Sequence, residues 1–221
     1  MSDQVRYPRE RDEPTDVARR APAQPVRLFG SDLLERLTRT RPATLVLFWV
    51  PVSSGLLFLG VRQGQLSGME VGGIAAAGVA AWTLFEYVLH RLAFHLDRWI
   101  SAAERFCFLM HGCHHADPSD AGRDIMPLIG SVPIFGAVLG VAIGILGDAG
   151  GVVFGSAFGS AYLAYDVLHY GCHQWPLPGR LGAYLKRHHL IHHFLDDACN
   201  FGVTSPLWDW IFGTRRVSRR L

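Results

Sequence analysis

The sequence predicts an all-α integral membrane protein, in which a four-helix transmembrane bundle carries a helical cap on its cytosolic side. Three observations lead to this fold class. Hydrophobic residues make up 49% of the 221 residues and charged residues only 18%, and the apolar residues gather in four long runs. Basic residues fall almost entirely on one side of these runs. All 11 histidines lie in four short windows, at the ends of the runs or in the segments that follow them.

The segments that flank the apolar runs are polar. Residues 1–30 are rich in Arg, Asp, Glu and Pro, which predicts a disordered cytosolic N-terminal tail without a cleaved signal peptide. Residues 31–42 predict a short interfacial helix, because Ser31 or Asp32 can cap it and its leucines form an apolar stripe. Residues 215–221 form a basic C-terminal tail that suits anionic lipid headgroups.

Each apolar run is about as long as a bilayer is thick. The predicted spans are about 43–61, 71–90, 125–146 and 149–168. The first run holds 19 residues without a charge, and as a helix it reaches roughly 28 Å. Glycine and alanine are frequent in the other three runs, and such small residues let membrane helices approach closely. A soluble protein of this length would keep little polar surface beside four such runs.

The arginines predict the orientation of the spans. If all four runs cross the membrane, 20 of the 21 basic residues lie on one side and only Arg62 lies on the other. The positive-inside rule makes the first side cytoplasmic, so both termini are expected there. The membrane would be the inner membrane of a bacterium or the endoplasmic reticulum of a eukaryote. A net charge of +2 is too small to indicate a nucleic-acid partner.

The histidine windows have spacings that suit metal binding. They cover residues 90–95, 111–115, 169–173 and 188–193. Residues three or four apart share one face of a helix, so His169 pairs with His173. By the same spacing His111 pairs with His114 or His115, and His189 pairs with His192 or His193. His90 and His95 are five apart and diverge on a straight helix, so the helix is expected to bend or end there.

The number of histidines predicts two metal ions. Ten or eleven imidazoles exceed the three protein ligands of a usual catalytic zinc, whereas two ions with about five ligands each fit the count. Neutral imidazole suits Fe, Zn, Cu and Ni. The four cysteines form no C-x-x-C pair, so neither a thiolate site nor a disulfide framework is expected. The helical cap is therefore predicted to carry a histidine-rich dimetal site.

Several segments resemble the fatty acid hydroxylase superfamily, also called the sterol desaturase family. The similarity covers about residues 80–214 and is closest to the fatty acid or ceramide 2-hydroxylase branch. It is carried by EYVLHRLAFH (86–95), HGCHHADPSD (111–120), AYDVLHYGCH (164–173), KRHHLIHHF (186–194) and FGVTSPLWDWIFGT (201–214). The resemblance implies one hydroxylase membrane domain over residues 43–214.

The resemblance also implies a ligand set and a cofactor. The family's metal residues match His90, His95, His111, His114, His115, His169, His173, His189, His192 and His193. The implied cofactor is a pair of iron ions, although zinc can occupy such a site in a purified sample. Metal-bound histidines usually donate their other N–H to a carboxylate or carbonyl, which makes Glu86 and Asp166 candidate partners. Asp124, Asp196 and Asp197 are weaker candidates. His188 is the extra histidine, and we expect it to support the ligands from outside or to be exposed.

The resemblance implies an O2-dependent hydroxylation of a lipid acyl chain, expected at the 2-position of a fatty acid or ceramide. No catalytic residue beyond the metal ligands is expected. The segment before Ser31 is too short for a cytochrome b5 domain, so a separate cytochrome b5-like or ferredoxin-like electron donor is expected, with membrane lipids as the other partners. Two alternatives stay open. The same site can desaturate or hydroxylate a sterol or carotenoid, and a single zinc would make a membrane hydrolase of the ceramidase type.

Overall fold

The computed structural model describes residues 26–218, and it is helical with no strand among those residues. The all-α prediction is therefore confirmed for this part of the chain, while residues 1–25 and 219–221 of the two predicted tails lie outside it. The α-helices are α1 (Asp32–Leu37), α2 (Pro42–Arg62), α3 (Gly68–Val88), α4 (Glu104–Cys107), α5 (Cys113–Ala116), α6 (Leu128–Gln174), α7 (Gly179–Phe194) and α8 (Leu207–Ile211). Short π-helices (Leu89–Phe94 and Phe108–Gly112) and 3-10 turns (Leu96–Arg98 and Ser101–Ala103) join them.

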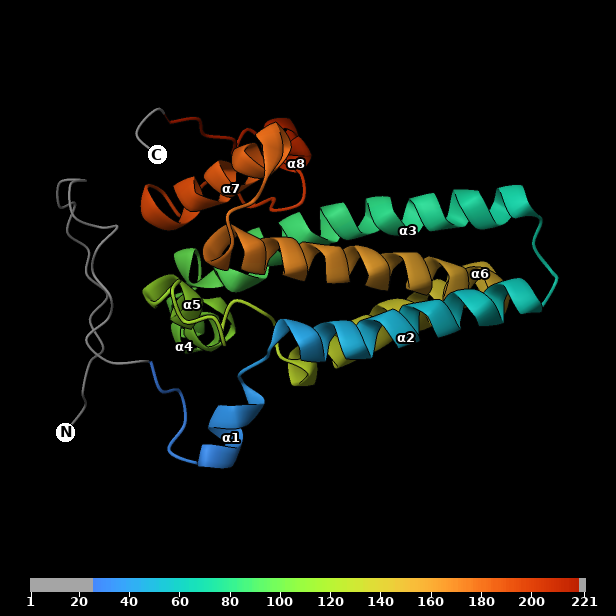
Figure 1. Cartoon of the computed structure of the whole chain (residues 1–221), viewed down its shortest axis with the longest axis horizontal. Helices are drawn as coiled ribbons and strands as arrows, with labels where there is room; N and C mark the ends of the chain where they lie inside the picture. Colours follow the sequence, from blue (N-terminus) through green and yellow to red (C-terminus); the bar gives the residue numbers. More distant parts are fainter. Residues whose placement is uncertain (1–25, 219–221) are drawn as a thin grey trace.

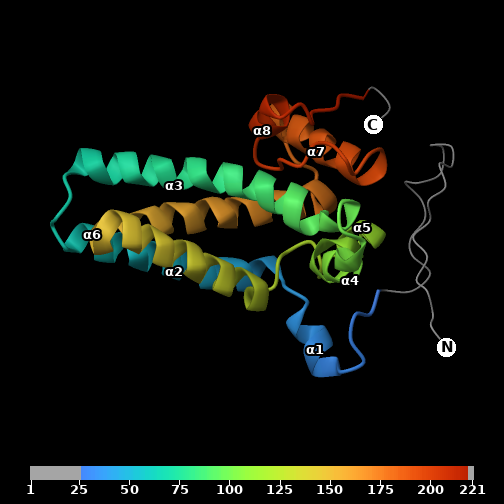
Figure 2. The same cartoon turned by 180° about the vertical axis from the view of Figure 1, so that it is seen from behind.

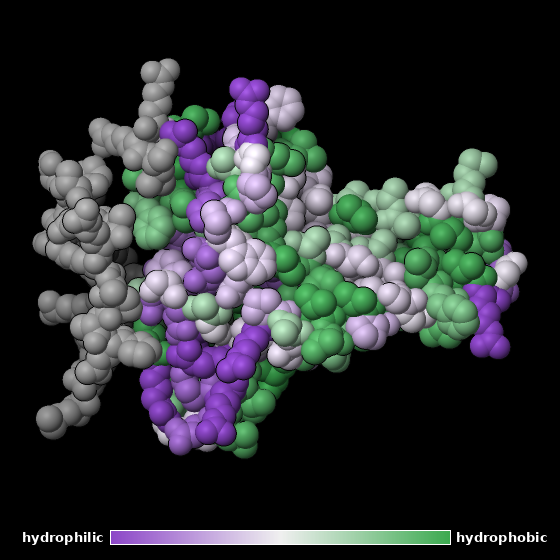
Figure 3. Space-filling model, viewed as in Figure 1, coloured by the Kyte–Doolittle hydropathy of each residue, from purple (hydrophilic) through white to green (hydrophobic). Residues whose placement is uncertain are grey.

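Three of these helices are long and apolar enough to cross a membrane. They are α2, the continuous helix Gly68–Phe94 formed by α3 and the π-helix after it, and α6. Their outer faces carry large apolar side chains, and Leu47 and Ile145 are each 75% exposed. Figure 3 shows apolar side chains along the elongated part of the molecule and many hydrophilic ones around its broader end. A surface of this kind suits contact with lipid.

Helix α6 is 47 residues long, but its backbone reverses at Gly147. A Cβ added at Gly151 would lie 2.5 Å from Ile143 Cα, and one at Gly155 would lie 2.6 Å from Leu139 Cδ1. The two arms of α6 are therefore antiparallel and in close contact, as Figure 2 shows for its yellow and orange parts. The first arm begins at Leu128, so residues 125–127 of the predicted third span precede the helix.

Gly147 makes this reversal possible, and its replacement gives a testable prediction. Its φ of 71° and ψ of 175° lie in a region that essentially only glycine occupies. We expect Gly147→Ala to destabilise the protein by about 1–3 kcal/mol, because the added Cβ strains the backbone. Gly144→Ala is the matched control, since it lies in a helical turn with open space around it. Thermal unfolding of both variants in detergent checks this, and equal melting temperatures would contradict it.

The helices of the bundle meet around aromatic side chains and small residues. Trp49 on α2 packs edge-on against Phe135 and Tyr162, one from each arm of α6. Where α3 crosses the second arm, a Cβ on Gly78 would lie 2.7 Å from Phe154 O, so only glycine permits this approach. The core thus places α3 and both arms of α6 side by side, with their polar ends at the cap.

The cap gathers at one end of the bundle. In Figures 1 and 2, α4, α5, α7 and α8 gather around one end of the long helices, with α8 beside the last turns of α3, and α1 lies to one side of them. Ser31 occupies the N-cap position of α1 but makes no capping hydrogen bond with its side chain. The segment is held instead by the buried Arg123, whose guanidinium pairs with Glu35 and donates to Val26 O at 2.9 Å. Leucines of α1 remain exposed on the other face.

Candidate metal centre

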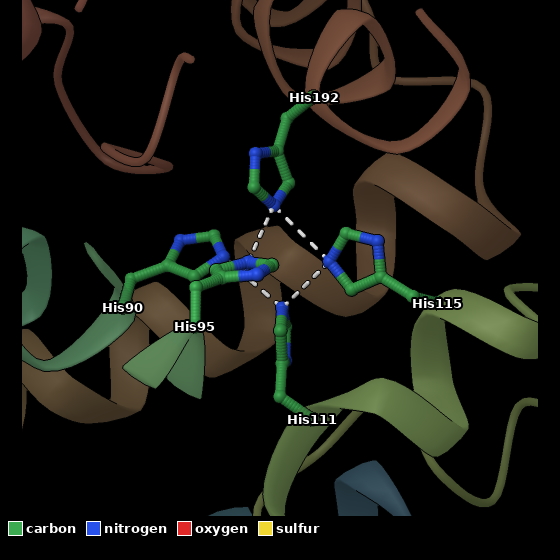
Figure 4. A group of neighbouring side chains, drawn as sticks. All are labelled: His90, His95, His111, His115 and His192. Carbon is green, nitrogen blue, oxygen red and sulfur yellow. Dashed lines mark hydrogen bonds between the residues drawn. The ribbon is translucent and has the colours of Figure 1, made fainter. Parts of the chain in front are cut away.

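Ten histidines come together in two groups of five at the junction of bundle and cap. Within each group, the five nitrogens that face one another lie within 4.8 Å. The first group is His90, His95, His111, His115 and His192, drawn in Figure 4 with the ring nitrogens directed at a common centre. The second group is His114, His169, His173, His189 and His193. The structure thus brings together every histidine that the sequence predicts as a ligand and leaves His188 outside both groups.

The π-helices explain how residues with awkward spacing join one group. His90 lies in the π-helix Leu89–Phe94, and His95 directly follows it with non-helical angles. Hydrogen bonds from i to i+5 widen the turn, which brings residues five apart toward the same face. The predicted bend or end of the helix at this point is confirmed. The second π-helix, Phe108–Gly112, carries His111 into the same group.

Neighbouring histidines in the chain belong to different groups. His114 and His115 on α5 separate in this way, and so do His192 and His193 on α7. The open choice of pairs is thereby resolved, because His111 joins His115 and His189 joins His193. The two groups also touch, since the rings of His115 and His193 stack with their centroids 4.1 Å apart. Helices α5 and α7 can therefore each supply ligands to both of two neighbouring ions.

Backbone carbonyls fix the tautomer of three of these rings. His90 Nδ1 lies 2.6 Å from Phe201 O, His192 Nδ1 lies 2.7 Å from Cys199 O, and His169 Nδ1 lies 2.6 Å from Asp124 O. A carbonyl oxygen can only accept, so each Nδ1 carries the proton and donates it. Each Nε2 then presents a lone pair to the interior of its group. This is the arrangement in which imidazole binds a metal.

The inward nitrogens fit a cation better than they fit one another. His111 Nε2 lies 3.0 Å from both His90 Nε2 and His115 Nε2, and His173 Nε2 lies 2.8 Å from His189 Nε2. In the second group, His169 Nε2 and both ring nitrogens of His193 are buried without a hydrogen-bond partner. Buried polar atoms without partners are costly, and converging lone pairs repel. A metal ion in each group would give the buried nitrogens a partner and would replace the repulsion between their lone pairs by attraction to the cation.

The electrostatics of the site keep the cap histidines neutral. Burial lowers the pKa of His95 to about 2, with further contributions from His90 and Arg98. Burial and the neighbouring His115 and His90 likewise hold the pKa of His111 well below its usual value. A lowered pKa means that the ring is unprotonated at neutral pH, and only that form can bind a metal. The ligands therefore need no deprotonation step before metal binding.

The outer partners of the ligands differ from those expected. Glu86 accepts hydrogen bonds from Val203 N at 2.5 Å and Thr204 N at 2.9 Å, so it holds the loop after α7 and reaches His90 only through that loop. Asp166 is buried, but the N–H of His169 goes to a carbonyl. Proximity in sequence misled here, because the true partner of His90 is 111 residues away.

A weaker candidate from the sequence lies closest to the second group. Asp124 holds His169 through its carbonyl, places Oδ1 3.1 Å from His114 Nδ1, and accepts from Gln174 Nε2 at 2.7 Å. His188 is buried with Nε2 3.2 Å from Asp209 Oδ2. The other weak candidates, Asp196 and Asp197, pair with arginines. No sequence spacing indicated Asp209, which lies in a stretch without ligands.

The position of Glu86 predicts a structural effect of its replacement. In Glu86→Leu, no oxygen is left to accept from Val203 N–H, Thr204 N–H or the Thr204 hydroxyl. Leaving such buried donors unsatisfied costs about 1–3 kcal/mol, so we expect a lower melting temperature and a looser loop. Glu70→Leu, at the exposed N-terminus of α3, is the control and should change little more than its own cap. A melting temperature equal to that of the unchanged protein would contradict this role.

Two adjoining pockets lead from the bundle to the histidines. The first is narrow and apolar and lies among α3 and both arms of α6, with Trp82, Phe135 and Phe158 in its walls. The second has a volume of about 210 Å³ and reaches His111, His114 and His169. Both pockets share Phe94, Met126 and Tyr165 as lining residues. The second pocket touches both histidine groups, since His111 belongs to the first and His114 and His169 belong to the second.

Known proteins are similar to this chain in sequence and in fold. A family model described as fatty acid hydroxylase matches residues 75–214. A dihydroceramide fatty acyl 2-hydroxylase of Arabidopsis thaliana is 37% identical over 194 residues, which are 85% of this chain and 79% of that protein. A ceramide very long chain fatty acid hydroxylase of Saccharomyces cerevisiae is 37% identical over 85% of this chain and 48% of its own length. A human fatty acid 2-hydroxylase is 32% identical over 86% and 57%, respectively.

A solved structure agrees with these relationships. It is described as full-length scs7p with only the hydroxylase domain visible, and it superposes with a TM-score of 0.80 at 33% sequence identity. The match covers 86% of this chain and 72% of that one. This chain spans about half the length of the yeast and human relatives, and the matched part contains the whole histidine constellation. On the family model, the identities and the fold together, the chain belongs to the fatty acid hydroxylase family.

Proposed function

We propose that this protein is a membrane-bound di-iron oxygenase that hydroxylates a lipid acyl chain at the 2-position, in a fatty acid or a ceramide. The observation that carries the proposal is the pair of five-histidine groups beside a pocket lined largely by apolar residues, in a chain of this family. The relatives in Arabidopsis and yeast are named for hydroxylation of acyl chains in dihydroceramide and ceramide. The reaction class is that of an oxidoreductase.

The two groups would each hold one iron ion through five imidazoles. When bound, the iron pair supplies the oxidising chemistry that inserts one atom of O2 into a C–H bond, while the other atom leaves as water with two electrons and two protons. The protein's part is to keep the imidazoles neutral, aim them, and shield the site. Zinc binds such ligands more tightly than ferrous iron, so the metal found depends on the preparation.

The pockets suit an acyl chain that enters from the bundle. The first pocket has a volume of only about 30 Å³, so its aromatic walls would have to move apart to hold the distal methylenes, and the second pocket would bring the carbons next to the carbonyl toward His111, His114 and His169. Each buried methylene contributes about 0.8 kcal/mol, so a long chain is bound without polar contacts. The walls of this slot would come from α3 and from both arms of α6.

The membrane topology and the electron source are part of the same proposal. The antiparallel arms of α6 are each about as long as α2, which supports four crossings with a turn at Gly147. The arginine distribution supports a cytoplasmic position for the histidine end and for both termini. We expect electrons to arrive there from a cytochrome b5-like or ferredoxin-like protein. In a bacterium the membrane is the inner one, and in a eukaryote it is the endoplasmic reticulum.

Lipid mass spectrometry tests the proposal. Cells that express the protein should contain acyl lipids heavier by about 16 Da, one oxygen atom, and fragmentation should place the oxygen at the 2-position. Cells that carry an empty vector are the control. Lipids lighter by about 2 Da would indicate a desaturase of the same site, and released fatty acids would indicate the zinc hydrolase. Either result would contradict the hydroxylation proposed here.

A further inference from the structure

One short loop orients two ligands of the first histidine group. The loop covers residues 199–202 and follows α7. Its carbonyls at Cys199 and Phe201 accept the Nδ1 protons of His192 and His90, at 2.7 and 2.6 Å. These histidines come from α7 and from the π-helix after α3, so the loop joins two distant elements. The directions of both inward Nε2 atoms therefore depend on where the loop lies.

Asp209 fixes the position of this loop. Its carboxylate is fully buried and accepts from Phe201 N and Gly202 N, each at 2.8 Å. The same carboxylate accepts from Thr214 Oγ1 at 2.7 Å, and His188 Nε2 lies 3.2 Å from it. Charge-assisted hydrogen bonds of this kind are short and strong. The side chain thus holds the N–H groups of Phe201 and Gly202. The peptide group between these two residues contains the Phe201 carbonyl that accepts from His90.

The loop has no room to shift without disturbing these bonds. A Cβ added to Gly202 would lie 2.2 Å from Ser205 O and 3.1 Å from Asp209 Oδ2. On the other side, Asn200 has a positive φ of 55°, and its side chain donates to His188 O at 3.0 Å and accepts from Arg216 N at 2.7 Å. The buried carboxylate of Asp209 therefore holds the loop in the narrow space between Ser205 on one side and the bonds of Asn200 on the other.

The second histidine group has a different support. Asp124, in the segment before α6, orients His169 through its carbonyl and lies beside His114 through its carboxylate. It belongs to a separate part of the chain from the loop and α8. Each histidine group is therefore supported by a different segment, and a substitution in one segment is not expected to displace the ligands of the other group.

We infer that Asp209 is the positioning residue of the first metal ion: by holding loop 199–202 it aims His90 and His192 at that ion and not at the second. This inference rests on the proposed function, because it requires an ion in each group. In Asp209→Asn, an amide N–H₂ must face the N–H of Phe201 or of Gly202, so at least one of these bonds is lost and the loop moves. Loss of a direct partner of a metal ligand, here the loop carbonyls of Phe201 and Cys199, weakens metal binding by roughly 10–100-fold, and a shifted loop should have an effect of that order.

Cobalt binding to the full-length protein tests the inference. The metal-free protein in detergent is loaded with Co²⁺ without oxygen, dialysed against increasing chelator, and analysed for metal per chain and for its visible spectrum. We expect two ions in the unchanged protein and one in Asp209→Asn at the same chelator concentration. The ion that remains should give the spectrum of His192→Ala, which damages the first group, and not that of His193→Ala, which damages the second.

Two further variants separate the loop from the carboxylate. Thr214→Val removes one donor to Asp209 but keeps the two loop amides, so it should hold two ions. Gly202→Ala keeps the carboxylate but displaces the loop, so it should lose the first ion as Asp209→Asn does. If circular dichroism shows that Asp209→Asn does not fold, the number of ions held by Gly202→Ala tests the inference in its place. Two ions held as firmly in Asp209→Asn as in the unchanged protein, or joint loss of both from a folded variant, would overturn the inference. Fewer than two ions in the unchanged protein would instead refute the proposed dimetal function.

Discussion

Replacing His192 by alanine is expected to abolish hydroxylation and to leave one firmly held ion in place of two. His192 Nε2 lies 3.1 Å from His115 Nε2 and 3.3 Å from His95 Nε2, at the centre of the first group. Its loss removes a direct ligand, which should cost more than the roughly 100-fold that the loss of an outer partner can cost.

The measurement combines lipid mass spectrometry in the expressing cells with metal counting on the purified variant. Arg187→Ala is the matched control, since Arg187 is an exposed residue on the same helix. It should keep both ions and the full amount of hydroxylated lipid. A His192→Ala protein that still makes 2-hydroxylated lipid would show that the first group is not needed for the reaction. Equal loss in both variants would point to a general defect of α7.

The site was easier to predict from the sequence than the parts that support it. Histidine is informative in itself, so four windows with helical spacing were enough to indicate a metal site. The family resemblance implied which ten of the eleven histidines are the ligands, and the structure gathers all ten. The five-residue step from His90 to His95 also indicated an irregular helix, which is a π-helix here. Sequence spacing could not decide between His114 and His115 as the partner of His111, because the second π-helix alters the turn just before them.

The outer partners could not be predicted because they depend on tertiary contacts. Glu86 and Asp166 stand three or four residues before a ligand, which places them on its helix face but says nothing of the loop that arrives from elsewhere. The carbonyl of Phe201 and the carboxylate of Asp209 reach the first group only after the chain has folded back over the bundle. The reversal at Gly147 was indicated only by a break between two apolar runs, and its positive φ has no sequence signal beyond glycine itself.

The metal-free protein is expected to lose stability steeply as the pH falls below about 6.5. Seven histidines outside the membrane-spanning helices have pKa values lowered by burial, aided by repulsion from neighbouring charges; they are His95, His111, His114, His115, His189, His192 and His193. In the unfolded chain each would titrate near 6.5. Below that pH the unfolded state binds more protons than the folded state, so the free energy of unfolding decreases as the pH falls.

The expected slope is large because the effects add. Each neutral buried histidine contributes about 1.4 kcal/mol per pH unit between the unfolded pKa and its own lowered value. Three of them would remove about 4 kcal/mol per unit, against a total stability of about 5–15 kcal/mol for a typical domain. Above about pH 7.5 both states are unprotonated at these positions, so stability should not depend on them. Bound metal opposes protonation and should shift the loss to lower pH.

Thermal unfolding of the metal-free protein between pH 8 and 5 measures this slope. His95→Gln provides the comparison, because its ring has a pKa of about 2 in the folded protein and titrates freely only when the chain unfolds. Removing that one group should make the slope shallower by about 1.4 kcal/mol per pH unit without abolishing it. A stability that stays constant or rises toward pH 5 would mean that the histidines are already protonated in the metal-free fold. In that case the cap would have to open to water when it loses its ions, and the geometry of the two groups would belong to the metal-bound protein alone.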